Sequence, residues 1–116
     1  MASHPSFSIV APVYGVERYI ANCADSLLGQ TYDNIQFIFV NDGTKDASIA
    51  LLEKLIDEKY SFLKDRIVIV NKHNEGLPAA RRTGMEYVTG DYVLHVDSDD
   101  WVEKDMVAKI AAKVVE

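Results

Sequence analysis

The chain has 116 residues, of which 48% are hydrophobic and 26% are charged. That length suits a single domain, and the composition excludes a fibrous or wholly disordered protein. The formal net charge of −6 argues against a general nucleic-acid binder, because such domains carry a basic surface that neutralises phosphates. We therefore expect one globular domain over 1–116 that has no nucleic-acid partner.

The sequence also bears on location. No apolar run approaches the roughly 18 residues that span a bilayer. The leader from Met1 to Ser6 is short and polar, without the features of a signal peptide. These observations predict a cytoplasmic protein. The single cysteine, Cys23, lies on the apolar face of an expected helix, which predicts a core residue.

Four short apolar runs, rich in Val, Ile and aromatic residues, predict β-strands. They are Phe7 to Val13, Ile35 to Val40, Ile67 to Val70 and Tyr92 to Val96. The second run is almost continuously apolar, which is typical of a central parallel strand covered on both faces. We interpret His95, inside the fourth run, as a core or near-core side chain.

A segment of helical period follows each strand, with apolar residues that recur every three or four positions. These segments are centred on 20–28, 49–56, 80–88 and 107–114. Asp46 is predicted to cap the start of the second helix, and Gly90 to follow the end of the third. The alternation predicts an α/β fold with a Rossmann-like, mostly parallel sheet and helices on both faces.

Ligands of such sheets bind beyond the carboxyl ends of the strands. Tyr14 follows Pro12 there, and its ring either stacks on a flat base or only packs against the protein. Asp42 ends the second strand, where its carboxylate either accepts hydrogen bonds from a nucleoside or only organises a turn with Gly43. Both residues are candidates for nucleotide binding.

The helix after the third strand begins near Arg81 and Arg82. Free N–H groups at a helix start, together with an arginine, favour a phosphate. The alternative is a capped helix with solvated arginines, and it carries more weight for Arg82 than for Arg81.

The fourth strand ends in the densest feature of the sequence, Asp97-Ser98-Asp99-Asp100-Trp101. Three neighbouring carboxylates repel one another, so they need a cation, hydrogen-bond donors or free solvation. Oxygen ligands suit Mg²⁺ or Mn²⁺, which take their remaining ligands from phosphates and water. The alternative is a purely structural acidic loop.

Taken in order, these motifs resemble those of the family 2 glycosyltransferases, which have the GT-A fold. The resemblance runs from Ser8 to about Val107. It rests on Ser8 to Tyr14, Asp25 to Tyr32, Val40 to Asp46, Asn74 to Gly76, Ala80-Arg81 with Gly84, and Gly90 to Trp101. Two positions depart from the family's usual pattern: Asn41, where Asp is common, and Arg82, where Asn is common.

The resemblance implies a role for each matching residue. The nucleotide pocket would be lined by Pro12, Val13, Tyr14 and Glu17, with Asp42 contacting the base. Asp97 would lie near the ribose, Asp99 would hold the metal, and Asp100 would support the site or cap the next helix. We thus expect catalytic roles for Asp97, Asp99 and Asp100, and donor binding by Pro12, Val13, Tyr14, Glu17, Asp42, Arg81 and Asp97.

The resemblance also implies an activity. It is the metal-dependent transfer of a sugar from a nucleoside diphosphate sugar, uridine-linked, to a glycan hydroxyl in surface polysaccharide synthesis, with Mn²⁺ or Mg²⁺ as cofactor. Family members invert the anomeric centre with a carboxylate base from the second half of the catalytic domain.

We therefore expect a chain cut after its fourth strand-helix unit, without the acceptor-binding part. Such a chain would bind donor weakly and transfer nothing by itself. Its open sheet edge would favour self-association.

Two other functions stay open. A flavodoxin-like signalling domain also gathers carboxylates around Mg²⁺, but it predicts an acidic pair where this chain has Pro12-Val13-Tyr14. A non-catalytic module that keeps the nucleotide pocket would share every motif above, and only an activity assay on the full-length protein separates it from an enzyme.

Overall fold

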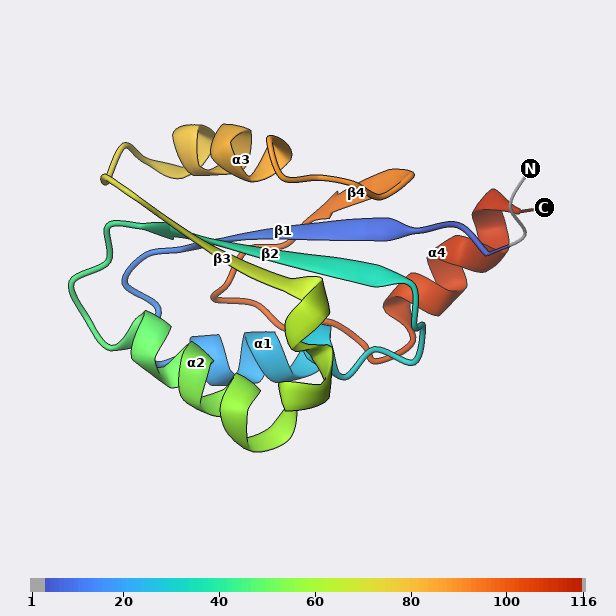
Figure 1. The fold of residues 1–116 in the computed structure, drawn as a ribbon, viewed down its shortest axis with the longest axis horizontal. Helices are drawn as coiled ribbons and strands as arrows, with labels where there is room; N and C mark the ends of the chain where they lie inside the picture. Colours follow the sequence, from blue (N-terminus) through green and yellow to red (C-terminus); the bar gives the residue numbers. More distant parts are fainter. Residues whose placement is uncertain (1–3, 116) are drawn as a thin grey trace.

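Four parallel strands form the centre of the structure, a computed structural model that describes residues 4–115 (Figure 1). The strands are β1 (Phe7–Val13), β2 (Ile35–Asp42), β3 (Ile67–Lys72) and β4 (Tyr92–His95). They lie in the order β3-β2-β1-β4, and every pair is parallel. The predicted strands and the predicted parallel sheet are both confirmed.

The two central strands are covered on both faces. All of β1 is buried, as is most of β2, which explains why these runs are almost continuously apolar. Their register pairs Phe7 with Ile35 and Val13 with Asn41. The carboxyl ends of both strands therefore reach the same edge of the sheet, and Asp42, the last residue of β2, lies at that edge.

Helices cover both faces, as the alternation predicts. They are α1 (Ile20–Leu28), α2 (Ser48–Lys59), α3 (Leu77–Met85) and α4 (Met106–Val114), with a short 3₁₀ helix, η1 (Ser61–Arg66). Figure 1 shows α1 and α2 on one face of the sheet and α3 on the other. The larger core joins alternate residues of β1 and β2, such as Ile9 and Phe39, to α1, α2 and α4. The smaller core packs Val10 and Ile38 against α3.

Cys23 is fully buried, as predicted, but the third helix and His95 differ from prediction. The helix ends at Met85 rather than near Gly90, although Tyr87 and Val88 fit its period. The chain must turn early to place β4 beside β1, and a Cβ on Gly90 would lie 2.8 Å from the backbone of Phe7 and Ser8.

His95 is exposed, so its interpretation as a core residue is wrong. It lies on the last strand of the sheet, next to Val10 in register. Helix α3 packs mainly on β1 and β2, so His95 lies to the side of its main contacts with the sheet. A sequence does not reveal which strand of a sheet lies at its edge.

Asp46 caps α2 as predicted. It precedes the helix by two residues, and its carboxylate accepts the N–H of Ser48, the first residue of the helix, at 3.0 Å.

None of the helices within 4–115 is long and apolar enough to cross a membrane.

The close approach of α3 to the sheet gives a first prediction. A Cβ at Gly84 would lie 2.4 Å from Val10 Cγ1 and 3.2 Å from Val40 Cγ2. We expect Gly84→Ala to destabilise the fold by about 1–3 kcal/mol, because the added methyl overpacks a filled core. Urea unfolding measures the change, with Thr83→Ala in the same helix as control. A stabilised Gly84→Ala, the usual result in an open helix, would contradict this packing.

Candidate functional site

A cavity of about 450 Å³ opens at the carboxyl ends of the strands. Figure 1 shows this edge of the sheet on the left-hand side, where loops join β2 to α2 and β3 to α3. It is lined by Pro12, Tyr14, Val16, Asp42, Asn74, Gly76, Leu77, Asp97, Ser98 and Asp99. These residues come from the ends of four strands, so the cavity lies where a parallel sheet is expected to bind its ligand.

Asp42 forms the floor of the cavity and is only 2% exposed. One carboxylate oxygen accepts the Glu75 N–H at 3.0 Å and lies 3.3 Å from Lys72 Nζ. The other accepts the Gly76 N–H at 3.0 Å and the Asn74 amide at 3.4 Å. Asp42 thus organises the loop that follows β3, which lies 32 residues or more further along the chain.

Burial alone would raise the pKa of Asp42. Hydrogen bonds from the Glu75 N–H, the Lys72 ammonium and the Gly76 N–H outweigh burial and hold that pKa below its usual value. Lys72 in turn has a raised pKa, chiefly through its hydrogen bond to Glu75. The carboxylate on the cavity floor is therefore ionised, and a lysine that is 12% exposed neutralises it.

Three residues at the end of β1 and after it were expected at the nucleotide pocket, and only one of them lines the cavity. Tyr14 is 51% exposed at the cavity wall. Val13 is fully buried in the core instead of lining the cavity, because alternate side chains of a strand point to opposite faces. The Glu17 side chain is exposed, and its backbone N–H donates to Asp46 at 3.3 Å. Neither Val13 nor Glu17 is among the described residues that line the cavity.

The acidic cluster consists of Asp97, Asp99 and Asp100 and lies after β4. One oxygen from each carboxylate lies within 4.8 Å of the others, and all three side chains are exposed. Ser98 is buried between them, and its hydroxyl donates to the Pro12 carbonyl at the end of β1. The turn that presents the carboxylates is therefore fixed to the central strand.

An ion pair with α3 and a buried thiol bear on the charge of the cluster. Arg81 from α3 donates to Asp97 at 2.9 Å, which places a guanidinium beside the carboxylates. Arg82 is exposed. Beneath the cluster, burial and then the charges of Asp100, Asp99 and Asp97 raise the pKa of the Cys23 thiol to about 12. This thiol stays protonated at neutral pH and is no nucleophile.

The donor set of the cluster fits a hard divalent cation. All three groups offer oxygen, and within 4–115 only Asp97 has a cationic partner, Arg81. Asp99 and Asp100 are left without a neutralising side chain in that range, which is the arrangement that Mg²⁺ or Mn²⁺ completes with water and phosphate oxygens. Of these two, Asp99 also lines the cavity.

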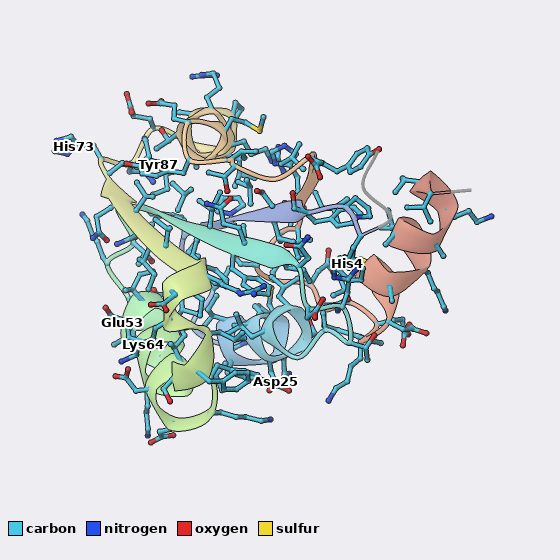
Figure 2. All side chains as sticks on the ribbon, turned by 45° about the vertical axis from the view of Figure 1, so that its right-hand side comes forward. His4, Asp25, Glu53, Lys64, His73 and Tyr87 are labelled. Atoms are coloured by element: carbon cyan, nitrogen blue, oxygen red, sulfur yellow. The ribbon has the colours of Figure 1, made fainter. Side chains whose placement is uncertain are left out.

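Several residues that line the cavity were not predicted from the sequence. Val16, Leu77 and Ser98 carry no chemistry that marks them, and Asn74 with Gly76 stood out only as part of a motif. The signal for Asn74 and Gly76 was their position after the third strand, because that loop must meet the ends of the other strands. His73 in the same loop is exposed and projects outward from the sheet (Figure 2).

Comparisons with known proteins identify the family of the chain. A family described as glycosyl transferase family 2 matches residues 8–116. Glycosyltransferase GlyA of Streptococcus pneumoniae serotype 4 is 43% identical over 109 residues, which cover 94% of this chain and 15% of GlyA. The putative glycosyltransferase EpsH of Bacillus subtilis is 42% identical over 101 residues, which cover 87% of this chain and 28% of EpsH.

Solved structures also resemble this fold. The crystal structure of S. aureus TarS 1-349 in complex with UDP superposes with a TM-score of 0.82 at 26% identity. The match covers 94% of this chain and 32% of that one. This chain therefore spans only a part of each protein that it resembles.

The hydrogen bonds of Asp46 give a pH prediction. Contacts with Ser48 first, and then with Thr44 and Glu17, lower its pKa from 3.8 to about 2 against the effect of burial. A carboxylate with a lowered folded-state pKa stabilises the fold above the unfolded value, and this contribution is lost as the pH falls through the folded value. Urea unfolding at about pH 7, 4 and 2.5 should show a smaller acid loss in Asp46→Asn than in the wild type. Equal losses would contradict the assignment.

Proposed function

The chain belongs to glycosyl transferase family 2, and we propose that it forms the donor-binding part of an enzyme that transfers a sugar from a nucleoside diphosphate sugar to a glycan hydroxyl. One observation carries the proposal. A single cavity has an aromatic ring and a buried carboxylate, Tyr14 and Asp42, together with the exposed carboxylates Asp97 and Asp99. A nucleoside suits the first pair, and a diphosphate with its cation suits the second.

At the nucleoside end, the exposed Tyr14 ring offers a face for a flat base. Asp42 accepts an N–H of the base by giving up its longest contact, the Asn74 amide at 3.4 Å. The Asn74 N–H released in this way then becomes available to a base carbonyl, while the amide keeps its bond of 3.0 Å to the Asp42 carbonyl. The complex of TarS with UDP supports a uridine-linked donor.

At the diphosphate end, Asp99 and its neighbour Asp100 hold Mg²⁺ or Mn²⁺, and Asp97 lies toward the ribose. When bound, the metal supplies charge neutralisation on the departing diphosphate. Arg81 keeps Asp97 in place through its bond of 2.9 Å and adds positive charge beside the phosphates. The site thereby favours departure of the leaving group.

The acceptor hydroxyl needs a base, and the carboxylates that line the cavity within 4–115 all have other tasks. Asp42 holds a loop, while Asp97 and Asp99 serve the donor. We propose that another part of the full-length protein supplies the base. We also propose that the acceptor is a surface polysaccharide. We propose a cytoplasmic location as well, the one expected from the sequence.

The binding prediction is a metal-dependent shift in thermal unfolding. We expect UDP with Mn²⁺ to raise the midpoint of this chain, and GDP and ADP to raise it less. Ligand at about 100 times its Kd adds about 2.7 kcal/mol, which is several degrees for a small domain. Asp99→Asn should abolish the shift, because it removes a charged metal ligand.

Glu103→Gln is the matched control, because Glu103 is an exposed acid in the same loop whose side chain does not line the cavity. It should keep the full shift. The proposal fails if no nucleoside diphosphate shifts the wild-type midpoint, or if Asp99→Asn responds like the wild type.

We further propose that copies of the chain associate through β4, which ends the sheet within 4–115. The N–H groups of Tyr92 and Val96 bond to the β1 side, so the alternate N–H of His95 points outward. We expect the mass measured by sedimentation to rise with concentration, and His95→Pro to prevent the rise, because proline removes that donor. A wild-type chain that stays monomeric at high concentration would contradict this.

A further inference from the structure

The loop after β1 is attached to the turn after β2 by three consecutive backbone N–H groups. The bonds are Gly15 N–H to Thr44 Oγ1 at 2.9 Å, Val16 N–H to Ser48 Oγ at 3.0 Å and Glu17 N–H to Asp46 Oδ2 at 3.3 Å. These partners lie 29 to 32 residues away in the sequence. The turn thus holds three successive N–H groups in the loop between Tyr14 and the start of α1.

Asp46 determines the direction of these bonds. Its Oδ1 accepts the hydroxyl protons of Thr44 at 2.7 Å and of Ser48 at 2.6 Å. A hydroxyl has one proton, so a hydroxyl that donates to Asp46 can only accept from the loop. A charged acceptor also strengthens each bond in the chain that leads to it. The ionised carboxylate therefore orients both hydroxyls toward the loop amides.

Side-chain packing explains only part of the loop's position. Val16 is partly buried and packs against the larger core, whereas Tyr14, Gly15 and Glu17 are exposed. No atom lies within 4 Å of a Cβ built on Gly15, whose φ is +64°. Hydrogen bonds to the turn after β2 are therefore what holds Gly15 and Glu17, on either side of Val16, while Tyr14 and Val16 form part of the cavity wall.

We propose that Asp46 is a positioning residue for the donor site. It touches no ligand, and through Thr44 and Ser48 it fixes the loop that carries Tyr14 and Val16 onto the cavity. This inference rests on the proposed function, because it assigns Asp46 a part in nucleotide affinity. It goes beyond the capping of α2, which needs only the Ser48 N–H.

The test combines loop dynamics with ligand affinity in this chain, both measured by NMR. Amide hydrogen exchange at Gly15, Val16 and Glu17 reports the loop, and a titration with UDP and Mn²⁺ gives the Kd. We expect Asp46→Ala to speed exchange at these amides and to raise the Kd by about tenfold, the effect of losing one charge-assisted hydrogen bond. The exposed Asp57 lies in α2, the helix that Asp46 caps, and provides a control. Asp57→Ala should change neither the exchange rates nor the Kd.

Thr44 separates positioning from a general loss of stability. Thr44→Val keeps the shape but loses the acceptor of the Gly15 N–H, so exchange should quicken and the Kd should rise. Thr44→Ser keeps the hydroxyl and should restore both to wild-type values. This pair also serves if Asp46→Ala does not fold.

Each remaining outcome overturns the proposal. Unchanged exchange in Asp46→Ala and Thr44→Val would mean that Asp46 does not hold the loop. Faster exchange with an unchanged Kd would mean that the held loop does not position the ligand. If the wild type binds no nucleoside diphosphate, the proposed function itself fails, and the role of Asp46 in affinity fails with it, whatever the exchange shows.

Discussion

The buried carboxylate of Asp42 is the interaction on which the site depends. A charge that is 2% exposed needs compensation, and the groups that supply it belong to Lys72 on the neighbouring strand and to the loop after it. Meeting that need draws residues 74–76 over the end of the sheet. The requirement of one side chain thereby shapes one wall of the cavity.

The opposite walls follow from the same sheet edge. Parallel pairing brings the ends of β1, β2 and β4 together, so the loops after them must share one small space. Ser98 attaches the acidic turn to the Pro12 carbonyl, and the turn around Asp46 attaches the loop that carries Tyr14. Three polar attachments thus place an aromatic ring, a buried carboxylate and an acidic cluster around one cavity. These elements are already in place without a ligand, which the proposed binding of a nucleoside diphosphate would exploit.

Much of this was predictable from the sequence. Strands that are almost continuously apolar and alternate with helices imply a parallel sheet, and its carboxyl edge names Tyr14, Asp42 and the acidic cluster as candidates. The resemblance to a family then gives these residues roles. What could not be predicted depends on partners far away in the sequence. The position of Asp46 just before α2 predicts a helix cap. Its bond to the loop after β1, 29 residues earlier in the sequence, forms only in the folded chain.

Other differences between expectation and structure have physical causes as well. Val13 was expected at the nucleotide pocket, but the alternation of β1 turns it into the core. His95 was expected inside, but its strand lies at the edge of the sheet. Tyr87 and Val88 fit a helical period, but the chain leaves the helix early to reach β1. Strand order and the exits of helices are decided by tertiary packing, to which a single sequence gives no direct access.

A crystal structure of this chain with UDP and Mn²⁺ tests the central claim most directly, because it locates both the metal and the base. The account predicts an anomalous manganese peak beside Asp99, diphosphate oxygens between that peak and Arg81, and uracil against Tyr14 above Asp42. The loop from Gly15 to Glu17 should keep its bonds to Thr44, Asp46 and Ser48. A nucleotide bound at the other end of the sheet, or one whose diphosphate points away from Asp99, would contradict the account.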